Sequence, residues 1–223
     1  MAPLTAPHWE ALTPETRQAF RQVASLPFIG QFYLAGGTGL ALHLGHRFSV
    51  DLDLFSTADA VGPATRAALR ETFDDPTLAI THDKEGTFVA TWHGVGVSFF
   101  RLSSYPLVQE PVLLEGVPLA TVEEIGAMKL AAITDRGTRK DLVDLYYILR
   151  QVSIERLFAV AAAKYPRART LAITATRALA YFVDAEALPM PRMLDQTPWP
   201  TMKRFLEQQA LAAGRQQLES LWA

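Results

Sequence analysis

Two aspartates separated by one residue are the side chains of this sequence best suited to chemistry. Asp51 and Asp53 lie in the run 49–55, which alternates polar and apolar residues as a strand does. Side chains two apart on a strand leave the same face, so the two carboxylates would lie side by side. Like charges held together repel and are costly to desolvate unless a cation compensates them. An all-oxygen pair suits a hard cation such as Mg²⁺, whose remaining ligands are water and substrate phosphates.

A glycine-rich turn precedes the acid pair. Gly36, Gly37 and Thr38 follow a predicted strand at 32–35 and open a predicted helix. Glycines allow close approach, and a helix N-terminus offers N–H groups and a positive end to phosphate. The same residues would also serve as a plain strand-to-helix turn, because they match neither a Walker A loop nor a full Rossmann fingerprint. Arg47, just upstream of the acids, could hold a phosphate or simply balance charge.

A lysine stands among apolar residues on a later predicted helix, 121–134. Met128, Leu130 and Ala131 flank Lys129 on what is a mostly apolar helix. A lysine in such a place either extends along the apolar surface to reach water or reaches into a cleft. The sequence alone leaves both interpretations open.

The next predicted helix, 139–151, carries a group of charges. Lys140 and Asp144 are four residues apart, and Asp141 and Asp144 are three apart, so each pair can share a helix face. A solvated face with an ion pair would explain this pattern as well as a functional site would.

The composition is that of a globular protein with no strong global field. The chain has 223 residues, 49% hydrophobic and 20% charged, with a net charge of −2. Any RNA contact must therefore come from a local patch, for which the candidates are Arg136, Arg139, Lys140, Lys164, Arg167, Arg169 and Arg177. The absence of cysteine excludes disulfides, thiolate zinc sites and cysteine nucleophiles. Without a signal peptide or an apolar run of membrane-spanning length, we expect a soluble, cytoplasmic protein that does not enter a membrane.

The order of predicted elements indicates two parts. Strands and helices mix in residues 1–105, including a predicted hairpin of strands 87–92 and 95–102 around His93-Gly94. Residues 106–120 are expected to be a connector, and 121–223 to be an all-helical domain whose last helix spans 201–222.

Four groups of residues, taken together, resemble a known family. They are Gly36-Gly37-Thr38, Arg47-x-Ser49-x-Asp51-x-Asp53, Lys129, and Arg136-x-x-x-Lys140-Asp141-x-x-Asp144-Leu145-Tyr146. In order and spacing they resemble the AbiEii/AbiGii-type nucleotidyltransferases, which include MenT-like enzymes and are toxins of bacterial abortive-infection and toxin–antitoxin systems. The resemblance covers roughly residues 30–150. It implies an α/β (α+β) fold: a polymerase-β-like nucleotidyltransferase core with a mixed sheet, followed by an all-helical C-terminal part.

The resemblance also implies roles for these residues. Gly36, Gly37, Thr38, Arg47 and Ser49 would bind the nucleotide, and Asp51 and Asp53 would bind Mg²⁺. Lys129 would contact the triphosphate, and Asp141 or Asp144 would be a further acid that activates the acceptor hydroxyl. Such enzymes transfer a nucleoside monophosphate from an NTP, some of them to the 3′ end of tRNA, and their usual partner is a cognate antitoxin.

One position departs from the wider superfamily. Many nucleotidyltransferases carry a third metal-side carboxylate on a strand next to the acid pair, and here Ser98 stands at the matching place in the predicted strand 95–102. Two alternatives therefore stay open beside RNA modification: transfer to a small molecule, as in antibiotic-modifying nucleotidyltransferases, and a degenerate partner that binds nucleotide or protein without turnover.

Overall fold

The structure is a computed structural model that describes residues 1–219. The chain divides into two compact units, Met1–Thr121 and a second that begins at Val122. The first unit contains α1 (Pro14–Ala24), α2 (Gly36–Leu44), α3 (Pro63–Thr72), β1 (Tyr33–Ala35), β2 (Asp51–Ser56), β3 (Ala79–Lys84), β4 (Thr87–Trp92), β5 (Val95–Arg101), β6 (Val112–Leu114) and β7 (Val117–Leu119), with 3₁₀ helices at Trp9–Ala11 and Ile29–Gln31. The second unit contains α4 (Val122–Arg136), α5 (Arg139–Leu149), α6 (Ile154–Lys164), α7 (Leu171–Leu179), α8 (Val183–Glu186) and α9 (Trp199–Glu219).

The expected fold class is confirmed by this arrangement of a mixed sheet with helices followed by a helical part. The helix predicted over 201–222 begins at Trp199. The part of that prediction beyond residue 219 lies outside the described residues.

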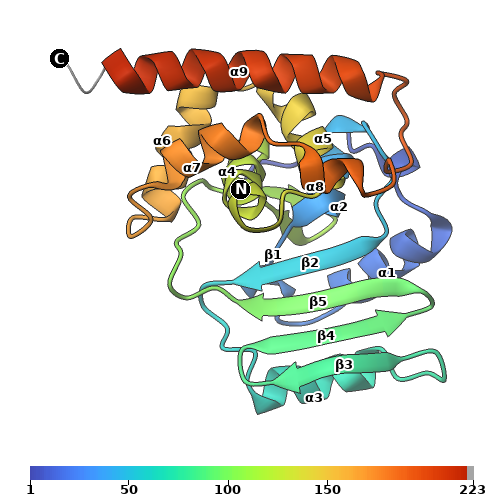
Figure 1. Cartoon of the computed structure of the whole chain (residues 1–223). Coiled ribbons are helices and arrows are strands. Elements are labelled where there is room, and N and C mark those ends of the chain that lie inside the picture. The colour runs from blue at the N-terminus through green and yellow to red at the C-terminus, as the bar shows by residue number, and fades with distance from the viewer. Residues whose placement is uncertain (220–223) are drawn as a thin grey trace. The chain divides into compact units, whose positions relative to one another are not determined.

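The first unit is built on one seven-stranded mixed sheet in the order β3-β4-β5-β2-β1-β7-β6. β2 lies at its centre, antiparallel to β1 and parallel to β5. The arrows of β2 and β5 lie side by side and point the same way in Figure 1. The predicted hairpin of β4 and β5 is confirmed, with Trp92 paired to Val95. His93 and Gly94, the two residues of its turn, both have positive φ, as the favoured two-residue hairpin turn requires.

Alternation along β2 fixes which face its acids occupy. Leu52 and Leu54 are fully buried and belong to one hydrophobic cluster with Phe99 of β5 and Phe20 of α1. Asp51 and Asp53, which alternate with these two leucines along the strand, leave the opposite face because successive strand side chains alternate. Burial of the two leucines in the core on one face of the sheet therefore places the two carboxylates on the opposite face.

A short hairpin lies in the segment for which the sequence predicted a connector, 106–120. β6 and β7 pair around Glu115 and Gly116, which have φ of +47° and +87°, and β7 continues the sheet by pairing in parallel with β1. Each strand has three residues, and β7 contains Pro118, so the usual strand signals are weak there. The sheet of the first unit thus extends past the strands that the sequence revealed.

Two helices of the second unit, α5 and α6, begin with side-chain caps, and α6 packs closely against α4. Thr138 accepts a hydrogen bond from the Asp141 N–H at the start of α5, and Ser153 does the same at the start of α6. On α4, a Cβ at Gly126 would lie 2.8 Å from the Leu157 side chain of α6. The missing side chain at Gly126 therefore lets these two helices approach each other.

Candidate active site

The two aspartates of β2 differ in exposure although they share a face. Asp51 is exposed and Asp53 is half-buried. In the sheet, Asp51 pairs with Gly96 of β5, and Asp53 lies between Ala35 of β1 and Ser98 of β5. Ser98 is thus in register with Asp53 on the adjacent parallel strand. This is the position at which many nucleotidyltransferases carry a third carboxylate, and here it holds a serine.

Two glycines make room for the carboxylates. Gly36, the first residue of α2, has a φ of +63°, and a Cβ there would lie 2.5 Å from Asp53 Oδ2. A Cβ at Gly96 would lie 2.6 Å from Asp51 Oδ1. Real Cβ atoms do not come so close, so any side chain at either glycine would displace a carboxylate. Gly96 was not among the sequence candidates, although a glycine inside a predicted strand signals close approach of another group.

The first turn of α2 is held to the start of β2 by hydroxyl groups. The Thr38 Oγ1 atom lies 2.8 Å from Ser49 Oγ and also hydrogen-bonds with the main-chain carbonyl of Asp51. Thr38 is fully buried and Ser49 nearly so. These two residues therefore fix the glycine turn against the acid pair.

A buried arginine lies beside the same turn. Arg47 is only 4% exposed, and its Nη1 donates to the Phe48 carbonyl at 3.0 Å. A Cβ at Gly37 would lie 2.5 Å from Arg47 Nη2, so the guanidinium lies directly against this glycine. The structure thus brings together Gly36, Gly37, Thr38, Arg47, Ser49, Asp51 and Asp53, all of which the sequence singled out.

The donor set at this site fits a hard cation with an incomplete protein shell. Within residues 1–219 there is no group of three or more His, Asp or Glu side chains placed to hold a metal ion. Two carboxylates with space kept by Gly36 and Gly96 instead match the Mg²⁺ pattern in which water and phosphate oxygens complete the shell. The protein part of such a site would consist of Asp51 and Asp53.

The second unit holds the other charged candidates in a buried cluster of its own. Lys129 Nζ donates to Asp141 Oδ1 at 2.6 Å and lies 2.7 Å from Asp144 Oδ2. Both carboxylates are completely buried, and Lys129 is 7% exposed. Thr138 Oγ1 donates to Asp141 Oδ2 at 2.5 Å, and Arg136 lies 3.4 Å from the same oxygen. Lys129 therefore neither extends to water nor stands alone, because its charge is enclosed by two carboxylates.

Burial and ion pairing act in opposite directions on the pKa values of this cluster. Burial alone would lower the pKa of Lys129, but the charges and hydrogen bonds of Asp144 and Asp141 outweigh it and raise that pKa. Burial would likewise raise the pKa of Asp141, but Lys129, Thr138 and Arg136 hold that pKa below its usual value. Lys129 and Asp141 thus remain charged together at neutral pH.

Two members of the predicted basic patch have structural roles instead. Lys164 is fully buried, and its Nζ donates to Glu124 Oε1 at 2.6 Å, so the expectation of an RNA contact at Lys164 is wrong. Arg139 donates from Nε to the Ala185 carbonyl and from Nη2 to Glu186, which joins α5 to α8. The sequence did not reveal this pair, because Glu124 is 40 positions away and the residues next to Lys164 in the chain give no indication of a buried partner.

Comparison with known proteins identifies relatives that match most of the chain. The sequence pattern of the family described as "Nucleotidyl transferase AbiEii toxin, Type IV TA system" matches residues 20–220. An uncharacterized protein of Aquifex aeolicus (strain VF5) is 32% identical over 179 residues, which cover 78% of this chain and 84% of that protein.

Solved structures show the same fold at low identity. The nucleotidyltransferase toxin MenT4 of Mycobacterium tuberculosis H37Rv aligns with a TM-score of 0.59 and 13% identity, over 88% of this chain and 82% of that one. The antibiotic-resistance factor ANT(2″)-Ia, solved in solution, aligns with a TM-score of 0.52 and 14% identity, over 70% of this chain and 94% of that one. A crystal structure of ANT(2″)-Ia with adenylyl-2″-tobramycin aligns with a TM-score of 0.51 and 14% identity, over 70% of this chain and 99% of that one.

Proposed function

Because the chain belongs to the Nucleotidyl transferase AbiEii toxin family, we propose that this nucleotidyltransferase moves a nucleoside monophosphate from an NTP to the 3′ end of a tRNA. We further propose that the reaction depends on Mg²⁺ and takes place in the cytoplasm. Within residues 1–219, no helix is both long enough and apolar enough to cross a membrane.

The observation that carries this proposal is the arrangement around β2. Asp51 and Asp53 share one sheet face, and the glycine turn at Gly36 comes so close to Asp53 that no side chain fits between them. A carboxylate pair beside a helix start supplies what a nucleoside triphosphate needs, namely ligands for its cation and N–H groups for its phosphates.

In the proposed reaction an acceptor hydroxyl attacks the α-phosphorus of the NTP. The new O–P bond forms, the bond to the β-phosphate oxygen breaks, and pyrophosphate leaves. Mg²⁺ held by Asp51 and Asp53 would neutralise phosphate charge. The backbone of Gly36 and Gly37 and the guanidinium of Arg47 would orient the phosphates, while Thr38 and Ser49 keep the turn in place. Catalysis of this kind rests on positioning and electrostatics.

The roles proposed for the second unit follow from the motif that Lys129, Asp141 and Asp144 complete. Lys129 would contact the triphosphate, and Asp141 or Asp144 would accept the proton of the attacking hydroxyl. Since the Lys129 ammonium is paired with both carboxylates, contact with a phosphate would require it to give up or share at least one of them.

The test is an assay with each α-labelled NTP, Mg²⁺ and total tRNA. Label that appears at the 3′ end of tRNA, and is lost on treatment that removes only the terminal nucleotide, would support the proposal. Internal label, or transfer to no RNA with any of the NTPs, would contradict it.

A small-molecule acceptor is the second candidate. The fold likeness to ANT(2″)-Ia covers 70% of this chain and nearly all of that enzyme, whose crystal structure holds adenylyl-2″-tobramycin. Aminoglycosides offered with the same NTPs separate the two: a labelled aminoglycoside with unlabelled tRNA would replace the RNA proposal. In either case, membership in a toxin family of a type IV toxin–antitoxin system implies an antitoxin as partner.

A further inference from the structure

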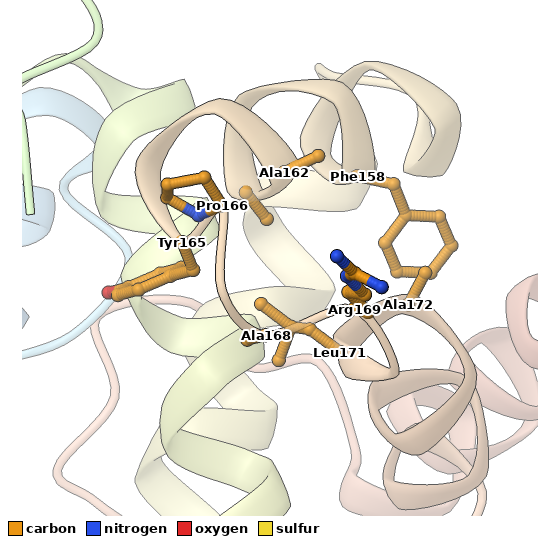
Figure 2. Close-up of a pocket in the computed structure, with 9 residues that line it drawn as sticks. Phe158, Ala162, Tyr165, Pro166, Ala168, Arg169, Leu171 and Ala172 are labelled. Carbon is orange, nitrogen blue, oxygen red and sulfur yellow. The ribbon is translucent and has the colours of Figure 1, made fainter.

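A pocket lies where α6 turns into α7, and none of its lining residues belongs to the motifs assigned to transfer. It has a cavity volume of about 110 Å³ and is lined by Phe158, Ala161, Ala162, Tyr165, Pro166, Ala168, Arg169, Leu171 and Ala172. Figure 2 shows the Arg169 side chain reaching from the turn toward α6, between Phe158 on one side and Tyr165 and Pro166 on the other. Alanines supply most of the remaining wall. The planar side chains of Phe158, Tyr165 and Arg169 therefore border a space that the small alanine side chains do not fill.

The chain around this pocket is positively charged. From Arg156 through Val183 there are five basic residues and no acidic one, although the whole chain has a net charge of −2. Arg156 and Lys164 are paired with Glu123 and Glu124, so the exposed positive charge of this segment comes from Arg167, Arg169 and Arg177. Arg167 and Arg169 are both exposed, and no carboxylate within residues 1–219 forms an ion pair with either. The guanidinium of Arg169, which lines the pocket, and that of Arg167, two residues earlier in the chain, are therefore available to an anion.

We propose that this pocket binds a nucleobase from a single-stranded part of the acceptor RNA, with adjoining phosphates on Arg167 and Arg169. The inference rests on the proposed function in so far as the acceptor is RNA. A base has a π face that stacks on aromatic rings and on the planar guanidinium of arginine, and both kinds of surface line this pocket.

Shape and charge together favour RNA over an acidic protein segment. The arginines alone would suit either polyanion. The aromatic ring of Phe158, the guanidinium of Arg169 and the alanine wall form a slot for a flat group, whereas an aspartate or glutamate side chain would leave that apolar slot unfilled. A duplex does not fit either, because its bases are already stacked.

The experiment measures binding of a fluorescently labelled, short single-stranded RNA to the full chain by anisotropy, without NTP. Phe158→Leu keeps an apolar side chain but removes the ring, and should weaken binding about tenfold, within the range for loss of one stacking contact. Arg169→Ala should weaken binding and also make the slope of log K against log salt shallower by about 0.7, because one phosphate contact is lost. Arg169→Lys should weaken binding but leave the slope of log K against log salt unchanged, because lysine keeps the positive charge but lacks the planar guanidinium that stacks on a base.

Arg204→Ala is the matched control, since it removes an exposed arginine from α9 of the same unit and should leave binding unchanged. Equal affinity of the native chain, Phe158→Leu and Arg169→Ala would overturn the proposal. The proposal would also be overturned if a polyglutamate peptide or an RNA duplex bound more tightly than the single strand and if that binding were weakened by the same pocket variants. Because no NTP is present, failure of tRNA labelling in a parallel assay would count against the proposed function and leave this binding result standing.

Discussion

Removal of the Lys129 ammonium should destabilise the protein severely, through the two carboxylates that it leaves behind. In Lys129→Met the side chain keeps its length and apolar stem but loses the charge 2.6 Å from Asp141 and 2.7 Å from Asp144. Both carboxylates are 0% exposed, so water cannot take over the role of the lysine. Breaking a buried ion pair from one side costs about 3–5 kcal/mol, which is a large share of the roughly 5–15 kcal/mol that stabilises a typical domain.

The stability loss caused by Lys129→Met should change with pH, whereas the loss from a simple packing defect should not. In the native chain the pKa of Asp141 is lowered from 3.8, so its contribution is present above that value and lost as pH falls through the lowered pKa. The pKa of Lys129 is raised from 10.5, so its contribution is present below that value and lost as pH rises through the raised pKa. Without the lysine, the like-charged acids should instead have raised pKa values. The stability difference between native and variant chains should therefore shrink from neutral to mildly acidic solution.

Urea unfolding at a series of pH values measures this difference. Lys140→Met is the control, since Lys140 is an exposed residue one position before Asp141 and its loss should change the free energy of unfolding by less than about 0.5 kcal/mol. A triple variant, Lys129→Met with Asp141→Asn and Asp144→Asn, should recover most of the loss because it removes the unpaired charges. A loss below about 1 kcal/mol for Lys129→Met, or one that is the same at every pH, would refute the reasoning.

Three further changes test other parts of the first unit. Asp53→Asn should lower transfer about hundredfold with an unchanged unfolding curve; near-native rates of labelled-NTP turnover would exclude the carboxylate from the site. Gly96→Ala should displace the Asp51 carboxylate, because the new Cβ would lie 2.6 Å from its Oδ1, and so raise the Mg²⁺ concentration needed for half-maximal transfer and for thermal stabilisation by NTP. Gly30→Ala, which meets no atom within 4 Å, is its control, and equal Mg²⁺ curves for both variants would contradict the steric argument. Burial lowers the pKa of His43 from 6.5, so stability should fall as pH decreases below that value; His43→Gln should flatten this part of the stability curve, and an unaltered slope would rule His43 out as the cause.

Local patterns in the sequence were sufficient to predict the centre of the sheet. Alternation around Leu52 and Leu54 placed Asp51 and Asp53 on one face, and His93-Gly94 marked the β4–β5 hairpin. Each of these signals depends on neighbouring residues alone, and each held because core burial and turn geometry agreed with it.

Contacts between distant segments could not be predicted in the same way. The Lys164–Glu124 pair joins residues 40 positions apart, and nothing local distinguishes that lysine from a surface one. Gly96 makes room for Asp51 only because β5 lies beside β2 in a particular register. For Lys129 the sequence offered two environments, and the structure shows a third, enclosure between two acids from the next helix.

The measurement that tests the central claim most directly is metal-dependent transfer of α-labelled NMP by the native chain and by Asp51→Asn and Asp53→Asn. We expect the native chain to label the RNA 3′ end in the presence of Mg²⁺, to stop when the metal is chelated, and to resume when it is restored. Both variants should fold and should transfer about a hundredfold more slowly than the native chain. Transfer that continues in chelator, or that survives in a folded Asp51→Asn, Asp53→Asn double variant, would contradict a nucleotidyl-transfer site built on these two carboxylates.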